Sequence, residues 1–154
     1  MAYTFGMLDD RDIGILEALQ GDARATYADI GERVGLAASS VHERVRKLEA
    51  ARVLRGYHAD VDPEAVGLSV TALVSATPLD PRQPDDLPAR VLEFPEVLDC
   101  HSVAGPENYI LKVRTRSTSD LEDFLRRLRD KAEVQTRTTI VLSTAFEHRP
   151  LSPG

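Results

Sequence analysis

The sequence TYADIGERVGLAASSVHERVRKLEAARVL, residues 26–54, predicts two short helices joined by a tight turn and followed by a wing-like strand. Thr26 is expected to cap the first helix, and Asp29 completes a capping box with it. Gly35 provides a turn with positive φ, and Gly31 allows the second helix to approach closely. This order of elements is typical of a winged helix-turn-helix domain, which binds DNA.

The second of these helices has an apolar side and a polar side. Val41, Val45 and Leu48 recur at helical spacing, so they are expected to face the core. The other side is free to contact DNA, with base edges read near the start of the helix and phosphates bound by its basic residues. The predicted DNA-binding residues are Ser39, Ser40, His42, Glu43, Arg44, Arg46, Lys47 and Arg52.

Charge is unevenly distributed along the chain. The formal net charge is −6 at pH 7, so the whole chain has no general attraction to a polyanion. Residues 1–32 contain seven acidic and two basic side chains, whereas residues 33–57 contain six basic and two acidic ones. A solvated helix face is the ordinary explanation of such a run. Its coincidence with the turn and the apolar spacing favours double-stranded DNA as a partner.

Several classes of protein are not expected. Cys100 is the only cysteine, which argues against an internal disulfide or a Cys-based metal cluster. The four histidines show no metal-ligand spacing. The first residues lack a signal-peptide pattern, and no stretch approaches the roughly eighteen apolar residues of a membrane span. We therefore expect a cytoplasmic, nucleoid-associated protein with no metal, no cofactor and no membrane partner.

Two domains are expected. Asp62-Pro63 interrupts the strand that follows the reading helix. The expected parts are a DNA-binding domain over residues 1–60, a linker over 61–67, a second domain over 68–147 and a C-terminal tail over 148–154. The first domain should begin with a helix over residues 9–19 that buries Ile13, Leu16 and Leu19.

The second domain is expected to alternate strands and helices. Residues 68–77 alternate apolar and polar side chains, as in a half-buried strand. Further strands are predicted over residues 97–104, 109–115 and 136–146, and helices over 87–94 and around 121–128. This order predicts a ferredoxin-like βαββαβ fold with both helices on one face of an antiparallel sheet, so the whole chain falls in the α+β class.

The segment Asp99-Cys100-His101-Ser102 brings together the residue types of a nucleophilic site, as in an enzyme. Neighbours on a strand point to opposite faces, so Cys100 and His101 cannot form a hydrogen-bonded dyad. Cys100 is instead expected to share a face with Leu98 as a small core residue. We therefore expect no catalytic residues and no enzymatic activity.

Several motifs resemble those of the Lrp/AsnC family of amino-acid-responsive transcription regulators, over nearly the whole chain. In the first half these are Leu8-Asp9, Asp12, Ile15-Leu16, Leu19, the Arg44 to Glu49 segment and Gly56-Tyr57. In the second half they are Glu96-Val97, His101, Gly105-Pro106-Glu107-Asn108-Tyr109 and Thr136-Arg137-Thr138. The resemblance implies a homodimer, four of which form an octamer, and a free amino acid bound where effector domains of neighbouring subunits meet.

The resemblance also implies an effector site at the loop between the second and third strands. Backbone amides, an amide side chain and threonine hydroxyls can fix an α-carboxylate and an α-ammonium group. An ordinary hairpin loop beside surface threonines would have the same composition. The implied effector-binding residues are Gly105, Pro106, Glu107, Asn108, Tyr109, Thr136 and Thr138.

Three positions depart from the family pattern. Ala37 stands where a capping Ser is usual, so Ser39 or Ser40 is expected to cap the reading helix and shift its start. Arg52 stands where Gly is usual, and it must adopt a left-handed conformation at roughly 1 kcal/mol or use another turn. Asn108 replaces an Asp in the effector loop. The ligand preference of the family therefore cannot be copied to this chain.

The alternative function is a nucleoid-type protein that binds and bends DNA without a small ligand, and it differs from a sensor only in the effector loop.

Overall fold

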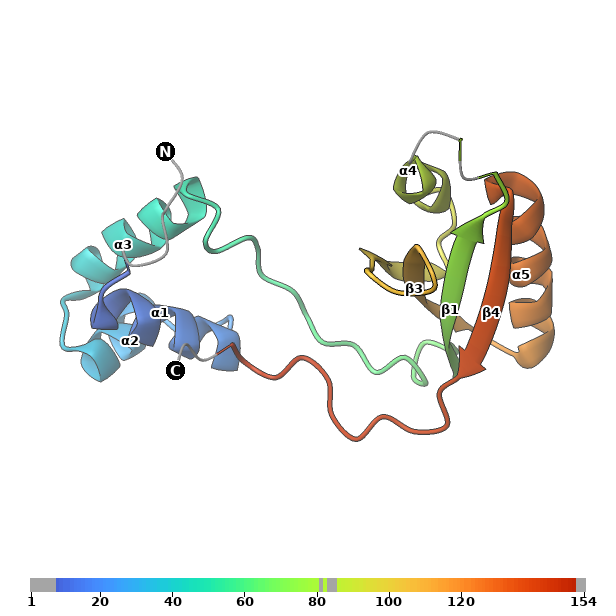
Figure 1. Ribbon diagram of the computed structural model, residues 1–154. Helices are drawn as coiled ribbons and strands as arrows, with labels where there is room; N and C mark the ends of the chain where they lie inside the picture. The colour runs from blue at the N-terminus through green and yellow to red at the C-terminus, as the bar shows by residue number, and fades with distance from the viewer. Residues whose placement is uncertain (1–7, 81, 83–85, 152–154) are drawn as a thin grey trace. The chain divides into compact units, whose positions relative to one another are not determined.

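The computed structural model describes residues 8–80, 82 and 86–151, which form two compact units (Figure 1). Residues 8–60 and 146–151 belong to the first unit, and residues 61–145 belong to the second. The predicted linker, 61–67, thus lies with the second unit. The described part of the predicted tail lies with the first unit, and residues 152–154 fall outside the described residues.

The first unit contains the predicted helix-turn-helix. Its helices are α1 Asp10–Gly21, α2 Tyr27–Val34 and α3 Ala38–Ala50. The capping box before α2 is confirmed, because Thr26 Oγ1 accepts the N–H of Asp29 at 3.2 Å. Gly35 adopts the left-handed conformation with φ 68°, which confirms the predicted turn.

Gly31 is needed for a closer contact than the sequence suggested. A Cβ atom there would lie 2.4 Å from the carbonyl oxygen of Leu36 and 3.6 Å from a methyl of Val41. The tightest neighbour is therefore the turn backbone, and the second helix comes next. Any side chain at this position would push the turn away from α2.

The two ends of α3 lie beside Ala37 and Arg52, two positions that depart from the family pattern. The prediction that Ser39 or Ser40 caps and shifts the helix is wrong: Ala37 is the N-cap, and no side chain caps the helix. The turn fixes this entry point, since the N–H of Leu36 donates to the carbonyl of Gly31 at 2.9 Å. At the other end Arg52 adopts φ 56°, so it takes the left-handed conformation that glycine would take more easily.

The buried face of α1 differs from the predicted one. Ile15 is fully buried, whereas Ile13 and Leu16 are only half-buried. Leu19 is buried as predicted. The prediction for Ile13 and Leu16 was wrong by one position on the helix, because α1 turns the side carrying Asp12, Ile15 and Ala18 toward the core.

The predicted wing-like strand is not formed, since residues 55–62 contain no strand. A strand needs a neighbour to pair its backbone N–H and C=O groups. The four strands found in the described part of the chain all lie in the second unit, so this segment has no such neighbour.

The tail is attached to α1 by a pair of hydrogen bonds. Gln20 Nε2 donates to the carbonyl of Leu151 at 3.1 Å, and the N–H of Leu151 donates to Gln20 Oε1 at 2.7 Å. One side-chain amide therefore binds both backbone groups of a residue 131 positions away.

The second unit has the predicted ferredoxin-like topology. Its elements are β1 Val70–Pro78, α4 Leu87–Val91, β2 Val97–Ser102, β3 Tyr109–Thr115, α5 Thr118–Ala132 and β4 Val134–Ile140. The sheet order is β2-β3-β1-β4, and all neighbouring strands are antiparallel. The helix α4 is shorter than predicted. The strand β4 ends at Ile140, the partner of Ala72 in β1, and does not extend to residue 146 as predicted.

One face of the sheet packs against the helices, and α5 runs beside β4 and β1 (Figure 1). Ala72, Val74 and Ala76 of β1 are fully buried on this helix side, together with Phe124 and Leu128 of α5. Intervening side chains point to the other side of the sheet, which we call the open face. In β1 the open face comprises Thr71, Leu73, Ser75 and Thr77.

The edge strand β2 contains an irregularity that changes which residues share a face. Its register with β3 shifts between Val97 and Asp99. As a result Val97 and Cys100 both pack against the core, while Leu98 is half exposed. Cys100 is thus a partly buried core residue as predicted, and burial raises the pKa of its thiol. Its predicted sharing of a face with Leu98 is wrong because the bulge breaks the alternation.

None of the helices in the described part of the chain is long and apolar enough to cross a membrane.

Candidate functional site

The helix α3 presents a polar surface over a firmly packed apolar side. Val41, Val45 and Leu48 are at most 1% exposed, which confirms the predicted core face. The polar side chains at Ser39, Ser40, Glu43, Arg46 and Lys47 are exposed. A rigid helix with polar groups on its outer side is the element that enters the major groove in helix-turn-helix proteins.

The basic residues of this surface are not equally available. Arg46 and Arg52 have no ion pair or hydrogen bond from their side chains to any described residue. Lys47 Nζ lies 3.8 Å from Glu43 Oε1, with both side chains about 60% exposed, and such a pair is weak. Arg46, Arg52 and Lys47 can therefore meet an approaching phosphate.

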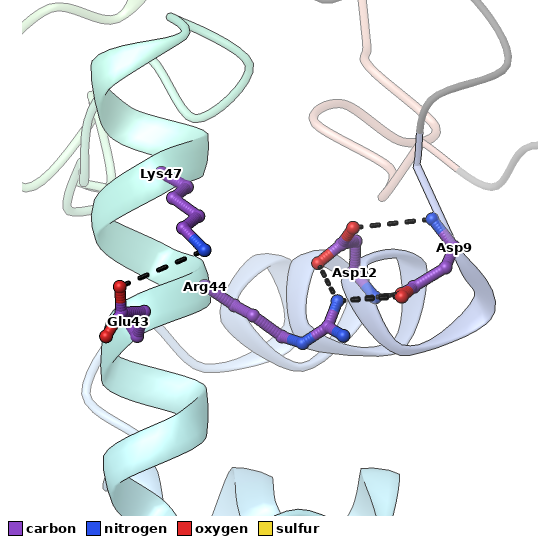
Figure 2. A network of polar contacts seen from close by, with 5 residues as sticks. All are labelled: Asp9, Asp12, Glu43, Arg44 and Lys47. Atoms are coloured by element: carbon purple, nitrogen blue, oxygen red, sulfur yellow. Dashed lines mark hydrogen bonds and ion pairs between the residues drawn. The ribbon is translucent and has the colours of Figure 1, made fainter.

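Arg44 reaches from α3 to two carboxylates at the start of α1 (Figure 2). Its Nη1 donates to Asp12 Oδ1 at 2.7 Å and to the two carboxylate oxygens of Asp9 at 3.0 and 2.8 Å. The side chains of Arg44 and Asp12 are 29% and 11% exposed. Arg44, a predicted DNA contact, thus forms a partly buried ion pair between α3 and the start of α1.

The same two carboxylates cap α1. Asp9 Oδ1 accepts the N–H of Asp12 at 2.8 Å, and Asp12 Oδ2 accepts the N–H of Asp9 at 3.3 Å. The N–H of Asp12 and the guanidinium of Arg44 hold the pKa of Asp9 below its ordinary value. The pKa of Arg44 is raised, chiefly by its hydrogen bond to Asp12. Sequence reasoning missed this cluster, although its signal was an Asp-x-x-Asp cap before the first helix.

The side of α3 near this cluster is hollowed. An open concavity of about 470 Å³ is lined by Asp12, Ser39, Ser40, Glu43, Arg44 and Lys47. His42, another predicted contact, lies on the flank against α2, with its ring centre 5.4 Å from that of Tyr27. The predicted base-reading residues are therefore split between the concavity and this flank.

The second candidate site lies at the loop between β2 and β3. A pocket of about 280 Å³ is lined by Ser75, Thr77, Pro106, Glu107, Gln135, Thr136 and Arg137. Glu107 forms an ion pair with Arg137 and accepts a hydrogen bond from Ser75 Oγ at 3.4 Å. Arg137 holds the pKa of Glu107 below its ordinary value, so this carboxylate is ionised at neutral pH.

Only some of the predicted effector residues meet here. Pro106, Glu107 and Thr136 line the pocket, and Gly105 and Asn108 lie exposed in the adjoining loop. Tyr109, expected to wall the pocket, is 3% exposed in the helix-side core. Thr138 pairs with Val74, so it also faces the helix side.

Arg137 is the main residue that sequence reasoning missed, although it stands between two predicted ones. The period of two in β4 gives the signal: Val134, Thr136 and Thr138 share a face, so Arg137 must point to the open face. Ser75 of β1 and Gln135 of β4 also point to the open face, and they were missed because the prediction did not compare the two faces of these strands. Among the described residues, no cluster of three or more His, Cys, Asp and Glu side chains could hold a metal ion.

Two family models match the chain. Residues 8–49 match the AsnC-type helix-turn-helix domain, and residues 69–151 match the Lrp/AsnC ligand binding domain. The chain is 49% identical over 146 residues to the HTH-type transcriptional regulator LrpA of Mycobacterium tuberculosis, and the match covers 95% of this chain and 97% of that protein.

Solved structures agree with these matches. A feast or famine regulatory protein from M. tuberculosis, complexed with L-methionine, matches with a TM-score of 0.93 and 49% identity over 95% of this chain and 99% of that chain. A transcriptional regulator from Neisseria meningitidis, also in complex with L-methionine, matches with a TM-score of 0.87 and 31% identity over 94% and 96% of the two chains.

Proposed function

The chain belongs to the Lrp/AsnC family of helix-turn-helix transcriptional regulators, and on this basis we propose that α3 reads DNA under the control of a free amino acid bound beside Glu107 and Arg137. Its place of action is then the nucleoid, in the cytoplasm. The observation that carries the amino-acid control is the pairing of opposite charges at the mouth of a small pocket.

An α-amino acid carries an ammonium group and a carboxylate a few ångströms apart. Glu107 can accept from the ammonium group, and Arg137 can bind the carboxylate through its fork of donors. The ligand replaces the internal ion pair with two equivalent pairs, so no buried charge is left without a partner. The loop residues Gly105 and Asn108 offer further donors at the edge of the pocket. Two similar structures contain L-methionine, which makes an amino acid the first ligand to test.

The DNA contacts follow from exposure. Ser39, Ser40 and Glu43 lie on the outer side of α3 and are proposed to reach base edges. Arg46, Lys47 and Arg52 are proposed to bind phosphates. His42 takes part only at the flank, beside Tyr27.

The open face of the sheet supports self-association. Leu73 is 42% exposed at the centre of β1, and Ile110 of β3 lies on the same face as the partner of Ser75, two residues further along β1. Apolar side chains in the middle of a sheet favour a partner surface, and a second copy gives a symmetric one. We propose a dimer at least, with four dimers closing an octamer. A dimer presents two α3 helices to half-sites about one helical turn apart.

Control by the amino acid follows from this assembly. A ligand at a pocket near a subunit interface stabilises those arrangements of subunits for which it has higher affinity. The spacing of the α3 helices then changes, and so does the affinity for DNA. Light scattering should show dimers or larger species at micromolar concentration, and a stable monomer would contradict this mechanism.

The test is a thermal shift screen of the twenty amino acids, followed by DNA titration with each binder. A ligand at a hundred times its Kd stabilises by about 2.7 kcal/mol. Arg137→Gln should remove this shift, while Arg116→Gln, a matched change at a side chain 79% exposed, should keep it. If no amino acid at millimolar concentration changes either melting or DNA binding, the ligand-independent DNA organiser is the correct function.

A further inference from the structure

We propose that Arg44 is a positioning residue: it fixes the reading helix α3 to the first turn of α1, and Asp9 and Asp12 keep it from binding DNA phosphates. This inference rests on the proposed reading of DNA by α3. It assigns to one basic residue of that helix a role opposite to the one its charge suggests.

The geometry ties two elements into one network (Figure 2). All three contacts of the guanidinium to Asp9 and Asp12, at 2.7 to 3.0 Å, are made by Nη1. Each of the two carboxylates also accepts a backbone N–H at the start of α1. Asp9 and Asp12 therefore hold the α1 cap and the α3 arginine at the same time. A change at Arg44 must be felt at the beginning of α1.

The local charge argues against a phosphate at this place. Two carboxylates surround one guanidinium, which leaves a net charge of −1, and the adjacent pair of Glu43 and Lys47 adds none. A phosphate approaching the Arg44 guanidinium meets two like charges within hydrogen-bond distance of that guanidinium. Arg46, in contrast, is exposed and has no acidic partner among the described residues.

The function of such a clamp is to hold orientation. Contacts to base edges require the reading side chains to be held within about 0.5 Å of their productive positions. The core of this unit is small, and α1 and α3 share few contacts compared with the strands of the other unit. A polar clamp with three short contacts adds a directional restraint that apolar packing does not provide.

The experiment measures the salt dependence of DNA affinity for the full chain by fluorescence anisotropy. The matched variants are Arg44→Gln and Arg46→Gln. The two arginines lie two positions apart on α3 and therefore point to different sides of the helix. The slope of log K against log salt is negative, and loss of one phosphate contact should reduce its magnitude by about 0.9 per subunit. We expect this drop for Arg46→Gln. We expect no change of slope for Arg44→Gln, but about a tenfold loss of preference for specific over random DNA.

A second variant gives a readout that a merely structural role would not move. In the double variant Asp9→Asn, Asp12→Asn the guanidinium is released from both charges. The magnitude of the slope should then increase by up to about 0.9 per subunit. Adding Arg44→Gln to that variant should remove the rise. Hydrogen exchange at residues 10–13 should become faster in Arg44→Gln and stay unchanged in Arg46→Gln.

An equal drop of slope in Arg44→Gln and Arg46→Gln would overturn the inference, and so would a slope unaffected by Asp9→Asn, Asp12→Asn. Circular dichroism checks that the variants are folded, and Arg44→Lys provides a milder substitution that should restore part of the preference for specific DNA. If Arg46→Gln leaves both affinity and slope unchanged, the reading by α3 itself fails, which is a distinct result.

Discussion

Each unit of this protein holds an arginine against carboxylates, and the two arginines differ in their freedom. The Arg44 side chain is 29% exposed and lies between two carboxylates that also cap a helix. The Arg137 side chain is 72% exposed and meets one carboxylate at the mouth of a pocket. The same pair of functional groups is thus proposed to restrain structure in one place and to bind a ligand in the other. Charge type alone does not distinguish these roles, whereas exposure and the other bonds of the carboxylate do.

The largest expected effect separates the two units. Gly31→Ala places a Cβ 2.4 Å from the Leu36 carbonyl, so it should destabilise the DNA-binding unit by up to about 3 kcal/mol and abolish DNA binding. Amino-acid binding measured by calorimetry should persist. Gly21→Ala, where no atom lies within 4 Å, is the control and should leave both activities in place.

The second prediction compares the two arginines directly. Arg44→Gln should lower the melting temperature of the DNA-binding unit by roughly 4 °C, because it removes a partly buried ion pair. Arg137→Gln should lower the melting temperature by less without ligand, because the Arg137 side chain is 72% exposed and water screens its charge. Differential scanning fluorimetry of both variants measures this contrast. Equal shifts would mean that exposure is not what separates the two pairs.

The third prediction concerns pH. The pKa of Asp9 is lowered in the folded protein, so its contribution to stability is present above the ordinary value of 3.8 and is lost as the pH falls through the folded value. The difference in melting temperature between the wild type and Arg44→Gln should therefore shrink between about pH 5 and pH 3. The pKa of Glu107 moves in the same direction, but the difference between the wild type and Arg137→Gln should be small throughout. A difference for Arg44→Gln that stays constant to pH 3 would contradict the role of Asp9.

The smallest expected effect is at the other glycine of interest. A Cβ at Gly105 would meet only Glu107 Oε2, at 3.7 Å, so Gly105→Ala should change stability by less than about 0.5 kcal/mol. DNA affinity without ligand should be the same as in the wild type. Amino-acid affinity should fall slightly, as measured by calorimetry. A large loss of stability would show that the loop is packed more tightly than its exposure indicates.

Local patterns of the sequence predicted much of this fold. The capping box at Thr26, the turn at Gly35 and the alternation of β1 depend on residues close together in the chain, and all three are confirmed. The strand order also followed, because only one simple topology fits that order of elements. The family motifs extended the prediction to the general position of the effector loop.

The features that the sequence did not predict depend on residues far apart in the chain, or, for the wing-like strand, on a neighbouring strand that the first unit lacks in its described residues. Arg44 lies 35 residues from Asp9, and Arg137 lies 30 residues from Glu107, so neither pair could be recognised before the helices and strands were placed. The wing-like strand failed because propensity does not supply a neighbouring strand. Cys100 and Leu98 were assigned to one face because a bulge cannot be read from a plain alternation.

The hydrogen bonds between Gln20 and Leu151 make the effector domain an insertion within the chain of the DNA-binding domain. The chain leaves the DNA-binding domain after α3 and returns to it after β4, the strand that carries Arg137. Ala72, near the start of β1, pairs with Ile140, the last residue of β4. The segment that leads into β1 and the segment that leaves β4 therefore meet the sheet at the same end. A displacement at the end of β4 can thus be transmitted to α1 along the covalent segment of residues 141–151.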